Sequence, residues 1–235
     1  MEIIQNGDWV LIIDLNGGRI RELKYQNEIV LGTYKRIDGK TGNTHICCPN
    51  FGSEGMEKFN LPFHGPFRNL DWKLIDKNEN KIEIEIENLD FKISQIFEIN
   101  DVFKQTIRIK NLVNEDRLIN MAIHNYWDAK NGWKGTKLND KIIDTLIETD
   151  SNQILSNINV LEIPGKQKYK WSLIGFKYGQ FWTSFKESNE GKIYDQNYVC
   201  VEPSLEKQGF LDEGMINLLG LKPLEFAQTI EFLDK

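Results

Sequence analysis

The sequence predicts an all-β protein, and three observations lead to that prediction. Apolar and charged residues alternate strictly from Lys81 to Glu87, which is the two-residue period of a strand with one buried face. Runs of β-branched and aromatic residues recur along the chain, separated by short turn-forming clusters of Asn, Asp and Gly. No long segment shows the 3.6-residue period of an amphipathic helix. We therefore expect a large antiparallel β-sandwich with few helices.

The N-terminus and the middle of the chain carry the clearest strand signals. The β-rich run Trp9–Leu15 is followed by the turn sequence Asn16-Gly17-Gly18, so that Ile20–Tyr25 and Glu28–Leu31 are expected as antiparallel neighbours. Farther along, strands follow at hairpin spacing and are joined by Asn- and Asp-rich turns, as in a meander. These middle strands are Lys81–Glu87, Phe91–Ile99, Val102–Lys110 and Leu118–Asn125.

The C-terminal half predicts further strands, with weaker boundaries. Ile142–Ile147 fits either a strand or a helix, and Ser151–Ser156 is predicted to be a loop or a short helical turn. Apolar and aromatic residues favour strands over Trp171–Phe176, Phe181–Phe185, Tyr198–Val201 and Ala227–Leu233.

A long irregular region, from about Arg36 to Arg68, separates the N-terminal strands from the meander. It is rich in Gly and Pro, and long loops of this kind inside a compact domain are often functional. Its aromatic residues, among them Phe51 and Phe63, can bury surface, so we expect the region to be ordered.

Composition limits the classes of protein to consider. The chain has 235 residues, of which 40% are hydrophobic, and we expect a single domain over residues 1–235. A net charge of −6 argues against a nucleic-acid partner, because no basic field would attract phosphates. No apolar run approaches the roughly 20 residues that cross a bilayer, so no membrane partner is expected. The N-terminus lacks the basic start and apolar block of a signal peptide, so a cytoplasmic protein is predicted.

The three cysteines are predicted to be free thiols. Cys47, Cys48 and Cys200 are odd in number, and the adjacent pair has neither a zinc nor a redox spacing. Burial as small hydrophobic side chains is their simplest interpretation.

One stretch has the composition of a functional loop. Leu61–Trp72 places Pro62 and Pro66 on either side of His64 and Gly65, which stiffens the backbone around the histidine, and Arg68 follows four residues after His64. A rigid loop of this kind on a scaffold often carries function. The alternative for Arg68 is a surface ion pair with an acidic residue.

Two residues at strand ends are further candidates. His124 ends an apolar strand and shares one face of it with Ala122 and Tyr126, so it is either a catalytic residue or a core histidine with its hydrogen bonds satisfied. Glu202 directly follows an apolar strand, where a buried carboxylate is costly without a partner or a task. The alternative is that the strand ends there and the side chain reaches water.

No metal or cofactor motif is present in the sequence. The three histidines lack short ligand spacings, and there is no nucleophile elbow, P-loop or dinucleotide fingerprint. Two histidines, a glutamate and an arginine on an all-β scaffold therefore suggest acid/base chemistry without a cofactor.

Several segments together resemble the aldose 1-epimerase (galactose mutarotase-like) superfamily. The resemblance covers most of the chain, and the block Ile46–Gly52 with Leu61–Asn69 and Trp72 is most similar to the branch that includes hexose-6-phosphate mutarotases. Weaker matches occur in the family's order: Gly17–Ile20 with Leu23, His124–Trp127, Cys200–Pro203 and Leu221–Glu225, the last with Leu224 where glycine is usual.

The resemblance implies a galactose mutarotase-like supersandwich that interconverts the α and β anomers of a sugar. Glu202 would remove the proton from the C1 hydroxyl, His124 would protonate the ring oxygen, and His64 would bond near the anomeric centre. The resemblance also implies no cofactor, a small-molecule sugar as substrate, and a monomer or homodimer. Sugar-contacting roles are implied for Arg68, Trp127, Phe63 and Asn50.

Two departures from the family leave alternatives open. The arginine that the phosphate-sugar branch carries before a Gly-Gly-Ile-Pro turn is missing from Asp38–His45, where Lys40 or Arg36 could replace it. The family's additional aspartate has four candidates: Asp128, Asp140, Asp144 and Asp195. A non-catalytic carbohydrate-binding protein on the same scaffold, a hexose-6-phosphate 1-epimerase, and a structural domain with satisfied histidines are the alternative functions.

Overall fold

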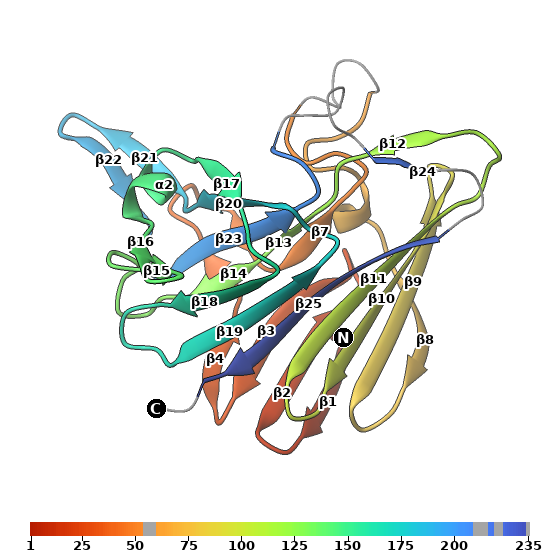
Figure 1. Ribbon diagram of the computed structural model, residues 1–235, viewed down its shortest axis with the longest axis horizontal. Coiled ribbons are helices and arrows are strands. Elements are labelled where there is room, and N and C mark those ends of the chain that lie inside the picture. The colour runs from red at the N-terminus through yellow and green to blue at the C-terminus, as the bar shows by residue number, and fades with distance from the viewer. Residues whose placement is uncertain (54–59, 209–215, 219–222, 234–235) are drawn as a thin grey trace.

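The computed structural model describes residues 1–53, 60–208, 216–218 and 223–233. Two large antiparallel sheets face one another and form a sandwich (Figure 1). The prediction of an antiparallel all-β sandwich with few helices is thereby confirmed. No helix in the described part of the chain is long and apolar enough to cross a membrane.

The first sheet has ten strands in the described residues. Its order is β1-β2-β3-β4-β14-β23-β13-β7, and β20 joins β23 to β17. Its strands are β1 (Glu2–Asn6), β2 (Trp9–Asp14), β3 (Arg19–Tyr25), β4 (Glu28–Leu31), β7 (His45–Cys47), β13 (Ala122–His124), β14 (Tyr126–Asp128), β17 (Asn152–Ile154), β20 (Tyr178–Trp182) and β23 (Tyr198–Ser204).

The second sheet has nine strands in the same described ranges, in the order β16-β15-β18-β19-β25-β11-β10-β9-β8. The predicted meander strands β9, β10 and β11 lie toward one end of this sheet, and the C-terminal strand β25 is its middle strand and the neighbour of β11. Its strands are β8 (Lys73–Lys77), β9 (Lys81–Asn88), β10 (Phe91–Ile99), β11 (Phe103–Asn111), β15 (Lys137–Leu138), β16 (Lys141–Ile142), β18 (Ile158–Glu162), β19 (Lys168–Ile174) and β25 (Pro223–Phe232).

Three strand pairs lie outside the two large sheets. The pair β21 (Phe185–Ser188) and β22 (Gly191–Tyr194) projects from the sandwich (Figure 1). The short hairpin β5 (Tyr34–Lys35) and β6 (Thr41–Gly42) belongs to the irregular region, and β12 (Arg117–Ile119) pairs with β24 (Ile216–Leu218). The described helices are η1 (Phe67–Asn69) and α2 (Asp144–Glu148).

One hydrophobic core fills the space between the two sheets. Trp127 of β14 and Trp171 of β19 meet there edge to face, with ring centroids 5.7 Å apart and both side chains fully buried. Along β23, Val199 and Val201 join this core, while Cys200 between them belongs to a separate cluster with Tyr126. Because successive side chains of a strand point to opposite faces, β23 serves the core with one face and the outer side of the first sheet with the other.

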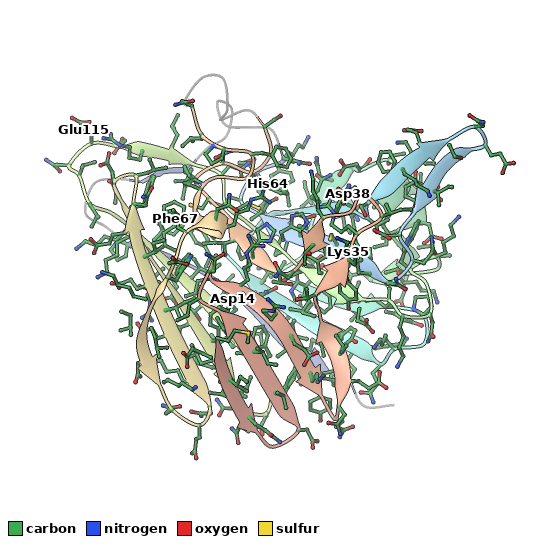
Figure 2. All side chains as sticks on the ribbon, turned by 180° about the vertical axis from the view of Figure 1, so that it is seen from behind. Asp14, Lys35, Asp38, His64, Phe67 and Glu115 are labelled. Atoms are coloured by element: carbon green, nitrogen blue, oxygen red, sulfur yellow. The ribbon has the colours of Figure 1, made fainter. Side chains whose placement is uncertain are left out.

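The irregular region packs against one end of the sandwich. In the view from behind, His64, Phe67 and Asp38 lie in the upper half of the molecule, beyond the labelled Asp14 (Figure 2). Phe67 is fully buried, and its carbonyl accepts a hydrogen bond from the Trp72 indole at 3.0 Å, which ties the region to the core. Residues 54–59 of this region, and Leu221 and Lys222 of the closing motif, lie outside the described residues.

Candidate active site

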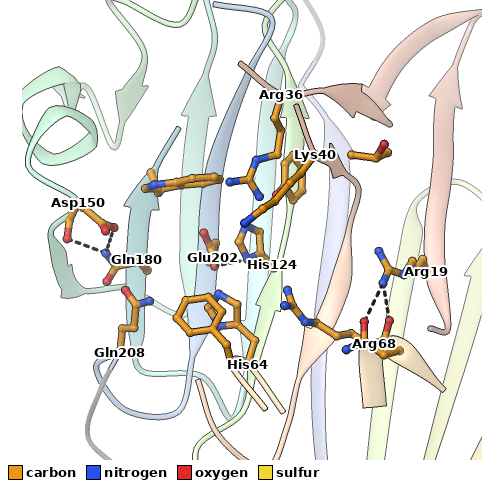
Figure 3. Close-up of a pocket in the computed structure, with 15 residues that line it drawn as sticks. Arg19, Arg36, Lys40, His64, Arg68, His124, Asp150, Gln180, Glu202 and Gln208 are labelled. Carbon is orange, nitrogen blue, oxygen red and sulfur yellow. Dashed lines mark hydrogen bonds and ion pairs between the residues drawn. The ribbon is translucent and has the colours of Figure 1, made fainter. Parts of the chain in front are cut away.

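A pocket of about 420 Å³ opens on the outer face of the first sheet. Five predicted site residues line it: Phe63, His64, Arg68, His124 and Glu202. Figure 3 shows Glu202 and His124 pointing toward one another at its centre, Asp150 on one side, and Arg19 and Arg68 on the other. The structure therefore brings together three residues that are far apart in the sequence, His64, His124 and Glu202.

Strand register explains why His124 and Glu202 meet. Ala122 pairs with Ser204 and Tyr126 pairs with Cys200, so His124 lies level with Glu202 between these two pairs. On the other side of β23, Gln180 pairs directly with Glu202. Residues that are level on neighbouring strands have side chains on the same face, so the sheet places a row of polar groups on the pocket floor.

The contact between His124 and Glu202 is close but does not have hydrogen-bond geometry. His124 Nδ1 is 3.1 Å from Glu202 Oε2, and neither atom has a hydrogen bond of acceptable alignment among the described residues. Both side chains are buried, with 6% and 2% of their residues' surface exposed. The two groups are therefore adjacent and still able to bond to a ligand.

Burial shifts the pKa values of this pair in opposite directions. Desolvation holds the pKa of the Glu202 carboxyl well above its usual range, because burial penalises the charged form. Desolvation likewise holds the pKa of His124 well below its usual range, and the neighbouring His45 and His64 add to this effect. Burial therefore favours the uncharged form of both groups.

The loop that carries His64 is fixed by its backbone. His64 has a φ of 61°, and its ring Nδ1 accepts a hydrogen bond of 3.1 Å from the Gly52 backbone N–H. That bond leaves the proton of the neutral imidazole on Nε2. Gly65 follows with a φ of 75°, and a Cβ atom there would lie 1.7 Å from the Cys48 carbonyl oxygen. Burial and the nearby Arg68 lower the pKa of His64 to about 3, so the ring is a neutral hydrogen-bond donor.

Arg68 is held by a histidine that sequence reasoning did not select. His45 stacks on His124 with ring centroids 4.9 Å apart, and its Nε2 lies 3.4 Å from Arg68 Nη1. His45 Nδ1 lies 2.7 Å from the Asn43 carbonyl oxygen, so this nitrogen carries the proton and Nε2 accepts from Arg68. Arg19 donates to the Arg68 carbonyl at 2.5 Å, which fixes the backbone of the same residue.

Two more cationic side chains reach the pocket from the β5–β6 hairpin. Arg36 lies over the Trp182 ring, 4.7 Å from its centroid, and forms an ion pair of 2.6 Å with Asp38. Lys40 is exposed and lines the pocket beside Arg36 (Figure 3). Both residues were candidates to replace the missing family arginine, and both are placed where a ligand in the pocket could reach them.

Two residues predicted to contact sugar do not line this pocket. Trp127 is fully buried on the opposite face of β14, where its indole donates to the Val201 carbonyl at 3.3 Å. The prediction was wrong because Tyr126, one residue earlier, has the side chain that faces the pocket. Asn50 is buried and donates to the carbonyl oxygens of Gly52 and Pro62, so it shapes the loop around His64 instead.

None of the four candidate aspartates lines the pocket either. Asp128 is buried in an ion pair with Lys166 and accepts a hydrogen bond from Tyr34, while Asp195 accepts from Tyr198. Asp144 accepts from the Gly135 backbone, and Asp140 lies in a turn with a φ of 64°. Their carboxylates, where bonded, stabilise the scaffold.

The aspartate that lines the pocket is Asp150, at the end of the segment after α2. Its Oδ1 accepts a 2.5 Å hydrogen bond from the Gln180 amide, which joins it to the row of polar groups that contains Glu202. Desolvation by the surrounding protein raises the pKa of this carboxyl. No sequence pattern marks Asp150, because its position depends on the fold of a loop next to β17.

The two facing antiparallel sheets and their connections define a galactose mutarotase-like sandwich, which is the fold of this chain. The Slr1438 protein from Synechocystis sp. PCC 6803 has a TM-score of 0.79 at 15% identity, over 100% of this chain and 96% of that one. A galactose mutarotase related enzyme from Lactobacillus acidophilus has a TM-score of 0.77 at 13% identity, over 99% and 97% of the two chains. A galactose mutarotase-like protein from Lactobacillus casei ATCC 334 also has a TM-score of 0.77, at 14% identity, over 99% and 100%. No protein-family profile and no curated protein sequence matches this chain.

Proposed function

We propose that this protein is a cofactor-free aldose 1-epimerase that interconverts the α and β anomers of a sugar in the pocket. The observation that carries the proposal is the adjacent pair of His124 and Glu202 in an open pocket, with His64 beside them. The names of similar structures, a galactose mutarotase related enzyme and a galactose mutarotase-like protein, support the same chemistry.

Mutarotation requires one proton to leave the C1 hydroxyl and another to reach the ring oxygen. Both oxygens are bonded to C1, so an acid and a base in contact with one another can serve both transfers. Glu202 takes the hydroxyl proton and His124 protonates the ring oxygen, after which the open-chain aldehyde rotates about the C1–C2 bond and closes on the other face.

The protons balance over this cycle without any external donor. Glu202 as carboxylate with His124 as imidazolium holds one proton, and Glu202 as acid with neutral His124 also holds one. Ring opening converts the first state into the second, and ring closure converts it back. Burial disfavours the charged first state, so a bound sugar must favour proton transfer from Glu202 to His124.

The other pocket residues have supporting roles in this proposal. His64 donates from Nε2 to an oxygen near the anomeric centre, and Arg68 binds sugar hydroxyls. Trp182 and Phe63 offer aromatic faces on which the apolar face of a pyranose can stack. Asp150 and Gln180 provide acceptors and donors for hydroxyls on the opposite side.

The charge of the pocket favours a sugar that carries an anionic group. Four cationic side chains line it, and the only carboxylates among its lining residues are Glu202 and Asp150. The cationic groups therefore outnumber the acids, and burial raises the pKa of Glu202, which favours its neutral form. A hexose 6-phosphate is therefore a second candidate substrate, with its phosphate near Arg36 and Lys40.

Polarimetry tests the proposal directly. We expect the purified protein to accelerate the change in optical rotation of freshly dissolved α-glucose, α-galactose or a hexose 6-phosphate above the rate in buffer. Decay at the buffer rate for all three sugars would contradict the enzymatic proposal. Calorimetric binding of one of these sugars without acceleration would instead favour a non-catalytic carbohydrate-binding protein.

A further inference from the structure

Donor atoms that suit a transition metal gather at the floor of the pocket, where His124 and Glu202 line the pocket and Cys200 is buried next to them. One ligand atom each from His124, Cys200 and Glu202 lies within 4.8 Å of the others, and all three residues are buried. Cys200 and Glu202 are two residues apart on β23 and therefore share a face, and His124 lies level with Glu202 on the neighbouring strand. Strand geometry thus assembles the three side chains, although their sequence spacing matches no metal motif.

A second trio, His45, Cys47 and His124, meets the same distance criterion in the described residues. Both ring nitrogens of His45 already have partners, the Asn43 carbonyl oxygen at 2.7 Å and Arg68 Nη1 at 3.4 Å. Glu202 Oε2 of the first trio, by contrast, has no hydrogen-bond partner among the described residues, and neither has either nitrogen of His124, which both trios share.

The identity of these donors selects the kind of ion. An imidazole nitrogen, a thiolate sulfur and a carboxylate oxygen are the ligands that Zn²⁺ takes in proteins, whereas Mg²⁺ and Ca²⁺ prefer oxygen alone. Three protein ligands would leave a fourth tetrahedral position for a water molecule or another ligand. On binding, the Cys200 thiol and the Glu202 carboxyl would each release a proton to solvent, because only the deprotonated groups are ligands.

We propose that His124, Cys200 and Glu202 form a Zn²⁺-binding site on the pocket floor, and that Zn²⁺ bound there excludes a sugar. Binding of Zn²⁺ is independent of the proposed function. Exclusion of a sugar by the bound Zn²⁺ rests on the proposed function. The ion would occupy the two groups to which we assign the proton transfers, so it acts as an inhibitor and not as a cofactor.

Cobalt spectroscopy on the metal-stripped protein tests the binding. Co²⁺ should produce the ultraviolet charge-transfer absorption of a cobalt–thiolate bond, and Zn²⁺ should displace it. Cys200→Ser should abolish the band and weaken Zn²⁺ binding at least tenfold in competition with a fluorescent chelator. Cys47→Ala and Cys48→Ala, which change the two other buried thiols, should keep the band.

Other results would overturn the assignment. A wild-type protein without a thiolate band has no such site, a result that needs no variant to fold. Loss of the band in Cys47→Ala, with retention in Cys200→Ser, would move the site to the other trio. Where polarimetry shows mutarotation, Zn²⁺ should raise the apparent KM for the sugar. Binding of Zn²⁺ by a protein without mutarotation would contradict the proposed function alone.

Discussion

The imidazole of His124 and the carboxyl of Glu202 lie 3.1 Å apart on neighbouring strands of one sheet, buried and without a well-aligned hydrogen bond between them. Buried polar groups in proteins are nearly always hydrogen-bonded, so a pair left in this state is costly for the fold. Such a cost is common at sites where the groups must bond to a ligand instead. The predictions below begin from this pair.

Glu202→Gln should reduce mutarotation by about 100-fold or more, since general acid/base catalysis contributes on the order of 10²–10⁴ and an amide cannot exchange the proton. The variant keeps the side chain's shape, so sugar binding measured by calorimetry should persist. Glu225→Gln is the matched control, because Glu225 is an exposed carboxylate on the second sheet, paired with Arg108. Equal rates for Glu202→Gln and the wild type would exclude Glu202 from the reaction.

Acid should destabilise the protein through its histidines. All three are buried, and burial lowers the pKa of each, that of His64 to about 3. An unfolded histidine titrates near 6.5, so between about pH 6.5 and 3 the unfolded state binds more protons. Stability is therefore full above about pH 6.5 and falls as pH decreases, by up to about 1.4 kcal/mol per pH unit for each histidine.

Glu202 has the opposite effect on the pH dependence of stability over part of this pH range. Its folded pKa is raised, so its contribution is present below the unfolded value of about 4.3 and is lost as pH rises. Between about pH 4.5 and 6.5, three histidines gain protons on unfolding and one carboxyl loses one. The free energy of unfolding should therefore still decrease as the pH is lowered. Urea unfolding at several pH values, with chelator present, measures this slope. This slope reports the number of protons taken up on unfolding, and His64→Gln should reduce that number by about one. An unchanged slope would contradict the low pKa assigned to His64.

Gly65→Ala should destabilise the loop that carries His64. The new Cβ would add a left-handed backbone cost of roughly 1–2 kcal/mol and a clash with the Cys48 carbonyl oxygen of roughly 1–3 kcal/mol. Gly39→Ala is the matched control, since Gly39 has a similar φ of 83° and open space around it, so only the first cost applies. Thermal unfolding of the two variants should differ clearly, and equal losses would show that the loop adjusts to the extra atom.

Lys40→Ala should weaken the use of a hexose 6-phosphate selectively. A charge-assisted hydrogen bond to phosphate contributes about 1.5–3 kcal/mol, so its loss should raise KM roughly tenfold or more. The KM for a neutral hexose should change little. Lys35→Ala, in the same hairpin, is the control, because Lys35 is exposed and does not line the pocket. If the KM for the neutral hexose rose as much as the KM for the hexose 6-phosphate, the result would argue against a phosphate contact at Lys40.

The sequence predicted the fold where alternation was regular. Phe91–Ile99 was placed to the residue, because one face of β10 is buried and the other carries mostly polar residues, Ile96 excepted. Elsewhere tertiary context decided: Leu118–Asn125 is divided into β12 and β13, and Ser151–Ser156, expected to be a loop or helical turn, contains the strand β17. Strand β17 exists because it pairs with β20, and such pairing leaves no local signal.

The site residues that could be predicted were those that lie within the family motifs. His64, His124 and Glu202 were found from residue order and converge on one pocket, as expected. Trp127 was selected because it belongs to the same motif as His124, although strand alternation had already placed Tyr126 on the His124 face. His45 and Asp150 could not be found, since cross-strand register places His45 beside His124 and a loop conformation brings Asp150 to the pocket.

The two faces of strand β23 should tolerate different substitutions. Val199 and Val201 contact the shared core, whereas on the other face Glu202 lines the pocket and Cys200 packs with Tyr126. In a saturation-mutagenesis scan read for both abundance and turnover, odd-numbered positions should lose abundance, and Glu202 should lose turnover while abundance is retained. Adaptation to a new substrate can therefore change the pocket-facing positions of this strand while the core-facing positions stay the same.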